Sequence, residues 1–519
     1  MGDRNLFKII RKRKGSAAIL LTLLFISIVI AFFAIVEGAG RLALKSTAEA
    51  SYDLAGRSIL SMYDRDLLER YGLFAFQADN NALKSYLEMF ANSTIETKDM
   101  SGGKSHVKSF ETSAFSITNP DNFMAELDNL MDKIIVENII SSAASNFKDF
   151  KNQINEKKSL EDDTDQLTSS LEEARKKELE SDDEDSGENN SDEMSIFEVI
   201  SVQSQIRKII NCSIGYEACP EGGAVLRNSS IINDLPSVEA DCRKNTAFSG
   251  IGNIISKFSS GLNSESIKED IYINEYIMEF FENHLMKHDD KASLFHNEVE
   301  YILYGDYSDD ENYKKAHRSI FVIRIASNMA YLLTDPEKKS EIMTVAEVLT
   351  PGPWARLTQL LITTAWSSVE AVNDMMNLEL HNSVPLIKSD KTWKTDLSVI
   401  TGGISSTRSI KPMRRLRAMG YIELNEGNMK YENYLRILLM TEDRNTKLYR
   451  IMDLIQINMK GSVRSDFLME DHCAGFSFKA NVSKKNLSRG FIKNNGDFTI
   501  DMSHTYVDLI KENYYGKEG

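Results

Sequence analysis

One uncharged, apolar run near the N-terminus constrains this chain more than any other feature. Residues 15–36 read GSAAILLTLLFISIVIAFFAIV, which is 22 residues without a charged side chain. As a helix rising about 1.5 Å per residue, this run would extend about 33 Å, and the hydrocarbon core of a bilayer is roughly 30 Å thick. The run therefore predicts one transmembrane helix, and no other stretch of the sequence is apolar over a comparable length.

The residues before this run set its expected orientation. Residues 1–14 hold six basic side chains and one acidic side chain, and the last four positions are Arg11, Lys12, Arg13 and Lys14. Basic segments next to a membrane helix stay on the cytoplasmic side. We therefore expect a single-pass protein of the cell membrane, with a short cytoplasmic tail over 1–14 and the bulk of the chain extracytoplasmic.

Three interpretations of the apolar segment remain open from the sequence alone. A cleaved signal peptide has an apolar region of about 7–15 residues, which is shorter than this one. Small residues at 38–40 would nevertheless suit a cleavage site. The second interpretation is a plain signal anchor, and the third is a pilin-like anchor whose helix continues into the external fold.

The sequence after the apolar run favours a continuing helix. Residues 37–70 contain no proline, and apolar side chains recur there at steps of three to five residues, which is typical of one helical face. The positions on this face are Leu44, Ala48, Tyr52, Ala55, Ile59, Met62, Leu67 and Tyr71. We predict one helix over 16–70, about 80 Å long; the alternative is two helices with a bend at Glu37-Gly38.

The rest of the chain predicts an α+β fold in which helices predominate. Only 8 prolines occur in 519 residues, and the abundant Leu, Ile, Met, Lys and Glu are good helix formers. Short strands are expected at 71–76 and 107–117. Residues 474–508 alternate apolar and polar side chains, which predicts a C-terminal β hairpin.

An acidic segment divides the part of the chain expected outside the membrane. Residues 151–193 hold sixteen acidic and six basic side chains, so most of the net charge of −16 lies there, and we interpret this segment as a solvated linker. It separates a membrane-proximal, pseudopilin-like α+β region over 37–150 from a distal, mainly helical domain over 194–519 that ends in the hairpin. The acidic balance argues against nucleic acid as a partner, because phosphate binding needs clustered Lys and Arg.

The cysteines leave a choice open. Cys212 and Cys219 are close in sequence and could form a disulfide in an extracytoplasmic domain. Cys242 and Cys473 complete the set. Four cysteines allow three full pairings, and buried free thiols are an equal alternative.

Residues that could carry chemistry are few. His284 and His288 lie four positions apart, so they share a helix face and could bind a metal with a carboxylate from nearby. The HExxH pattern is absent, and an exposed polar helix end explains the same residues. No GxSxG, P-loop or GxGxxG sequence occurs. We therefore predict no catalytic residue and no cofactor.

Several quoted stretches carry a resemblance to a known family. SILSMYDRDLLERYGLFAF follows the anchor at residues 58–76, and the distal part contains HNEVEYILYG, IRIASNMAYLLTDPEK, WSSVEAVND, VPLIKSDKTW, YENYLRILL and YRIMDLIQINM in that order. In these features the chain resembles the TadE/TadG-like assembly proteins of Flp (tight adherence) pili, and more specifically an uncharacterised Gram-positive branch of them. The resemblance covers most of the chain except the acidic linker.

This resemblance implies a non-enzymatic, pseudopilin-like component of a Flp-type pilus or a related secretion assembly. Its expected partners are the lipid bilayer and other pilus-assembly membrane proteins. Processed prepilins are cut after a glycine and carry Glu five residues on; here Gly15 is the matching glycine, but the Glu position holds Leu20. This departure favours a retained anchor. The alternative function is a membrane-tethered binding or sensory module for a wall polymer or a small ligand.

Overall fold

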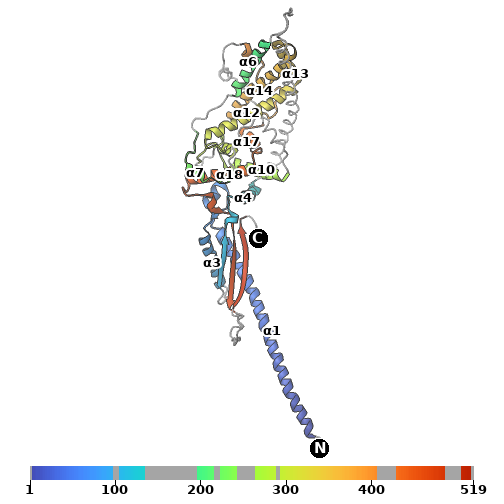
Figure 1. Cartoon of the computed structure of the whole chain (residues 1–519), viewed down its shortest axis with the longest axis vertical. Coiled ribbons are helices and arrows are strands. Elements are labelled where there is room, and N and C mark those ends of the chain that lie inside the picture. Colours follow the sequence, from blue (N-terminus) through green and yellow to red (C-terminus); the bar gives the residue numbers. More distant parts are fainter. Residues whose placement is uncertain are drawn as a thin grey trace, which may run out of the picture. The chain divides into compact units, whose positions relative to one another are not determined.

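The structure is a computed structural model in which helices predominate, as predicted (Figure 1). It describes residues 3–97, 104–134, 196–214, 223–241, 264–287, 293–405, 428–485 and 504–515. The expected acidic linker at 151–193 lies outside these ranges. Two compact units are present: unit 1 comprises residues 1–126 and 470–519, and unit 2 comprises residues 127–469.

Unit 1 is built on one long helix, α1 (Asp3–Leu60). Its other elements are α2 (Arg65–Tyr71), β1 (Phe76–Gln77), α3 (Asn80–Thr97), β2 (Lys104–Glu111), the short 3-10 helix Ser113–Phe115, β3 (His472–Cys473), β4 (Gly475–Lys485) and β5 (His504–Tyr514). Strands β2, β4 and β5 form an antiparallel sheet with β4 in the centre, and β1 pairs with β3. Helix α4 (Pro120–Ile134) contains the boundary between the units.

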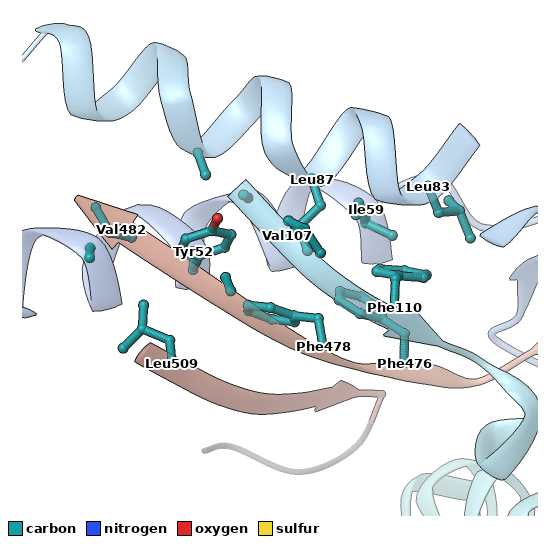
Figure 2. Packing of buried hydrophobic residues seen from close by; sticks show 14 of the residues in the cluster. Tyr52, Ile59, Leu83, Leu87, Val107, Phe110, Phe476, Phe478, Val482 and Leu509 are labelled. Carbon is teal, nitrogen blue, oxygen red and sulfur yellow. The ribbon is translucent and has the colours of Figure 1, made fainter. Parts of the chain in front are cut away.

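The core of unit 1 lies between the sheet and the helices α1 and α3 (Figure 2). Alternate residues of each strand point to this core, as the period of two along a strand requires. Phe478 of β4 stacks on Tyr52 of α1 with ring centroids 5.0 Å apart, and Phe476 stacks on Phe110 of β2 at 4.9 Å. Such aromatic pairs add about 0.5–1.5 kcal/mol each beyond the burial of their area.

Helix α1 confirms the continuous helix and corrects its end. It runs through Glu37 and Gly38 without a break, but it stops at Leu60 rather than near residue 70. Asp64 then caps α2, because its side chain accepts a hydrogen bond from Leu67 N, and its own N–H donates to the carbonyl of Ala75. These two bonds turn the chain back onto the unit. The predicted strand at 71–76 is accordingly reduced to β1, which begins at residue 76.

The C-terminal hairpin is present, but it does not belong to the distal part of the chain as expected. β4 pairs with β5 along its whole length, and β4 also pairs with β2, with Val107 opposite Ala480. The apolar face of β4 supplies Phe476, Phe478, Ala480 and Val482 to the core of unit 1. Alternation along a strand identifies the strand but not its partner, so the sequence alone could not assign the hairpin to the N-terminal unit.

Unit 2 is helical in the parts that the structure describes. Its helices are α6 (Ile196–Ile214), α7 (Ser229–Asn233), α8 (Pro236–Glu239), α10 (Ser264–Phe280), α11 (Glu298–Tyr304), α12 (Asp309–Thr334), α13 (Pro336–Leu349), α14 (Ala355–Glu379), α15 (Ser398–Ser405), α17 (Tyr431–Leu439) and α18 (Arg444–Ser462). Helices α12 and α14 pack against each other, and α14 also contacts α6 and α13. Helix α14 is therefore central to this unit, and it carries the charged side chains considered next.

Candidate functional site

Helix α1 has two halves with opposite surroundings. None of the side chains from Ala17 to Ala43 is buried, and Phe25 is 66% exposed. From Leu44 onward, one face of the same helix is buried in the core of unit 1. By length and composition α1 can cross a membrane. Soluble proteins rarely expose continuous apolar surface of this extent, so lipid is the environment that suits the first half.

Two helices of unit 2 bring four charged side chains together in the core. Arg324 lies on α12, Glu370 and Asp374 lie on α14, and Lys388 lies in the segment that follows α14. Glu370 and Asp374 are four positions apart, so they share one face of their helix. All four side chains are fully buried. We call these four residues the charge cluster.

The geometry of the charge cluster pairs every charge. Arg324 Nε and Nη2 donate to Oδ2 of Asp374 at 3.0 and 2.8 Å. Lys388 Nζ donates to Oδ1 of Asp374 and to Oε1 of Glu370, both at 2.6 Å. Two cations thus meet two carboxylates. The balance matters because an unpaired charge in a protein interior costs several kcal/mol, of the order of 3–5 when one partner is removed.

The charge cluster also fixes the backbone of the segment after α14. Arg324 Nη1 donates to the carbonyls of Pro385 and Leu386, at 2.9 and 3.2 Å. Thr395 N donates to Oε2 of Glu370 at 2.9 Å. These bonds tie both ends of the segment to α12 and α14. The amine of Lys388 thus contacts two carboxyl groups, those of Glu370 and Asp374, and the chemistry open to the cluster depends on how these two differ in basicity.

The two carboxyl groups differ in their pKa. Burial raises the pKa of Glu370 above its usual value, by more than the nearby ammonium group of Lys388 lowers it. Burial acts in the same direction on Asp374, but the charges of Arg324 and Lys388 outweigh it and leave the pKa of Asp374 below its usual value. Asp374 is therefore held as the anion, and Glu370 is the carboxyl group closer to neutrality.

A second set of buried acids lies between α11, α12 and α18. Glu298 and Glu300 are fully buried on α11, and burial raises the pKa of each to about 7. Burial also raises the pKa of Asp453 on α18, to about 6. Their oxygens accept neutral donors: Asn458 Nδ2 donates to Glu298 at 2.6 Å, and the Tyr431 hydroxyl donates to Glu300 at 2.9 Å. These three acids therefore make the stability of unit 2 depend on pH. Among the described residues they are not grouped as metal ligands.

His284, one of the two weak candidates for a metal ligand, is held by other contacts in the structure. His284 Nδ1 lies 3.3 Å from Oδ1 of Asn297, and its ring lies on that of Tyr313 with centroids 4.1 Å apart. Burial lowers the pKa of His284. His288 lies outside the described ranges. Within those ranges no three His, Cys, Asp or Glu side chains are grouped so that they could hold a metal ion.

The other positions singled out in the sequence are the cysteines, Gly15 and the basic residues 11–14. Cys212 lies in α6, but its side chain is not described, and Cys219 and Cys242 lie outside the described ranges, so the disulfide stays a prediction. Cys473 is free and buried, and burial raises the pKa of its thiol to about 12. The backbone of Gly15 lies in α1, as does that of Arg11, Lys12, Arg13 and Lys14, whose side chains are also not described.

Sequence reasoning missed the charge cluster, although it left a trace. Glu370 and Asp374 interrupt a largely apolar stretch at a spacing of four, and Arg324 stands between isoleucines in FVIRIAS. Charged side chains are almost never fully buried unless they are paired, so charges on an apolar helix face indicate partners elsewhere. The identity of those partners depends on the tertiary fold.

Comparison with known proteins gives one match. No curated protein and no solved structure matches the chain. One family model matches residues 190–484, more than half of the chain and nearly all of unit 2 that the structure describes. Its description is a family of unknown function. The chain therefore belongs to the family DUF5702.

Proposed function

We propose that the protein is a non-enzymatic, membrane-anchored component of a Flp/Tad-type pilus or a related secretion assembly. The observation that supports this most is α1, which is one helix from Asp3 to Leu60. Its side chains from Ala17 to Val36 are uncharged and none of them is buried, and from Leu44 onward it is a core element of unit 1. An anchor of this kind moves as one body with unit 1, which is what subunits that pack through their membrane helices require.

The proposed orientation follows from the charges that flank the span. Residues 11–14 are all basic, so the N-terminus is cytoplasmic and both units are extracytoplasmic. This orientation can be tested with a chain that carries a different tag at each end. Protease is added to cells whose wall has been removed and whose membrane is intact. We expect loss of a C-terminal tag and survival of an N-terminal one. Survival of the C-terminal tag, with an external control protein digested, would contradict the orientation.

A gene deletion tests the assembly role. In a cell that makes Flp pili, we expect the deletion to reduce surface pili and the full-length chain to restore them. A chain in which Leu44, Ala48 and Tyr52 are changed to Asp, Asp and Ser is the matched variant, because it keeps the span but removes the burial of α1 in unit 1. Normal piliation in the deletion strain would contradict the proposal.

The second candidate function is a membrane-tethered module that binds a wall polymer or a small ligand. The observation that favours it is that unit 2 is a compact unit of its own, which carries most of the family match. Such a module needs no pilus partners. Capture of the full-length protein after crosslinking in cells distinguishes the two: recovery of pilus-assembly membrane proteins supports the first function, and their absence with normal recovery of the bait supports the second.

A further inference from the structure

The amine of Lys388 lies where it can react with a carboxyl group. Its Nζ is 2.6 Å from one oxygen of Glu370 and 2.6 Å from one oxygen of Asp374, and the three side chains have no exposed surface. A bound amine and an acid held in contact react as if at very high concentration, because no entropy is lost in bringing them together. Burial adds a second condition, since it raises the pKa of Glu370 and so favours the neutral acid.

The two carboxyl groups are prepared for different roles. Both oxygens of Asp374 receive hydrogen bonds from cations, Oδ2 from Arg324 and Oδ1 from Lys388, and Asn328 Nδ2 donates to Oδ2 at 3.1 Å. These bonds hold Asp374 as an anion that can take a proton and return it. Glu370 instead accepts hydrogen bonds from Lys388 and from the backbone N–H groups of Lys394 and Thr395, and burial raises its pKa.

Backbone N–H groups face the carboxyl group of Glu370. Thr395 N lies 2.9 Å from Oε2, and Lys394 N lies 3.3 Å from both carboxyl oxygens. Fixed donors at this position stabilise the negative charge that develops on a carboxyl oxygen when a nucleophile attacks its carbon. The segment that carries them is held in place by the indole N–H of Trp366, which donates to Oγ1 of Thr395 at 3.1 Å, and by that of Trp393, which donates to its carbonyl at 2.9 Å.

We propose that Lys388 and Glu370 condense into an intramolecular amide bond, with Asp374 as the base, so that the mature protein carries a covalent cross-link between α14 and the segment after it. One ammonium proton moves to Oε1 of Glu370, which leaves a neutral amine beside a neutral acid. Nζ then bonds to Cδ of Glu370, and Asp374 carries a second proton from Nζ to Oε1. Oε1 leaves with two protons as water, and Asp374 is again the anion.

The charge balance of the core survives this reaction. Condensation removes one positive charge, that of Lys388, and one negative charge, that of Glu370. The pair Arg324–Asp374 remains, with its two hydrogen bonds intact. The amide N–H keeps Asp374 as its acceptor, and the amide oxygen keeps Thr395 N as its donor. Burial then protects the bond from hydrolysis.

Peptide mapping of the full-length protein, purified in detergent and digested with trypsin after denaturation, tests the proposal. Between Arg356 and Lys391 the only tryptic site is Lys388. A cross-linked protein gives the peptide 357–391, uncut at Lys388 and lighter than its sequence by one water molecule, with fragment ions that place the loss between Glu370 and Lys388. Complete cleavage after Lys388 overturns the proposal, as does a bond located at Asp374.

Two variants test the roles of Asp374 and Lys388, and one internal control tests whether burial of a lysine alone prevents cleavage. Asp374→Asn removes the base and Lys388→Arg removes the amine, and both keep a tryptic site, so each should give a normally cut peptide 357–388. Retention of the cross-link in the Asp374→Asn variant overturns the role of Asp374. Lys447 is the matched control in the same digest, because its amine is also buried but contacts one carboxylate, Asp270, and one amide, Asn274. It should be cut normally.

Discussion

The two units bury different kinds of side chain. In the described part of unit 1, the core consists of apolar and aromatic side chains from two helices and a sheet, and the buried acids and bases are Glu126 and His472. In unit 2, charged side chains lie among the apolar ones on almost every central helix. The acids are Asp270, Glu282, Glu298, Glu300, Asp309, Glu370, Asp374 and Asp453, and the bases are His317, Arg324, Lys388, Lys447 and Arg450.

This difference indicates which interactions stabilise each unit. Apolar contacts are non-directional, so the core of unit 1 depends on side-chain volume and shape. Paired charges need a particular partner at a particular distance, and their loss leaves a desolvated charge behind. We therefore expect unit 2 to respond most to the removal of charge, and unit 1 to respond most to the removal of volume. The predictions below test this contrast, in order of expected effect.

Removal of Arg324 should have the largest effect. Arg324→Met removes the arginine partner of Asp374 and the hydrogen bonds from Arg324 to the carbonyls of Pro385 and Leu386. We expect the unfolding free energy of unit 2 to fall by about 5 kcal/mol, as measured by chemical denaturation followed through tryptophan fluorescence. Arg318→Met is the control, since Arg318 is exposed on the same helix. Equal losses of stability in the two variants would contradict the expectation that unit 2 depends on its buried charges.

Removal of an aromatic ring from the sheet of unit 1 should come next. Phe478→Ala deletes a buried ring that stacks on Tyr52, and the loss should be about 4 kcal/mol. Ile510→Ala, at an exposed position of β5, is the control and should change stability by less than about 0.5 kcal/mol. Hydrogen exchange of the amides of β2 and β4 measures the effect in this unit alone. Unchanged protection in Phe478→Ala would contradict the prediction.

Acidification should stabilise unit 2. The pKa of Glu298 and that of Glu300 rise from 4.5 to about 7 on folding, so the folded state binds more protons than the unfolded state between these values. The resulting stabilisation is fully present below about pH 4.5 and is lost as the pH rises to about 7. Between pH 7 and pH 5 each of the two groups should contribute about 2 kcal/mol, which is about 4 kcal/mol together, measured by denaturation at each pH.

The control for this pH effect is the double variant Glu298→Gln, Glu300→Gln. It removes both titrating groups but keeps side chains of nearly the same shape, so its stability should change much less between pH 7 and pH 5. A wild-type profile that stayed flat, or that fell on acidification, would show that the buried acids are paired differently from the contacts described above.

The smallest effect concerns α1. Ile59→Val deletes one buried methylene group from the core of unit 1 and should cost about 1 kcal/mol. Leu54→Val is the matched change at a position of the same helix that is 55% exposed, and it should cost a few tenths of a kcal/mol at most. A larger effect at Leu54 would indicate that this face of α1 is covered in the protein's native surroundings.

The sequence predicts features that depend on local pattern. The apolar run of residues 15–36 marks the exposed part of α1, and the positions from Leu44 to Ile59 mark its buried face, because a helical period of 3.6 is visible in one segment. The alternation in 474–508 marks β4 and the beginning of β5 in the same way.

Features that depend on distant partners were not predictable. The end of α1 at Leu60 depends on Asp64 N bonding to the carbonyl of Ala75, and no proline or glycine marks it in the sequence. Lys388 looks like a solvated surface residue when taken alone, and only the return of the segment after α14 onto that helix makes it a partner of Glu370. The place of β4 beside β2 has the same origin, since Val107 meets Ala480 only in the folded chain.

The pairing of β2 with β4 has a consequence for the order in which the chain matures. Helix α1 leaves the ribosome long before the strands β4 and β5, which cover part of its buried face. Until the residues of β4 and β5 have been synthesised, the part of this face that they cover lacks its partners, whereas unit 2 is complete by Met469. The core of unit 1 is thus completed after unit 2 has been synthesised, and a chain truncated before residue 475 would leave part of the buried face of α1 uncovered.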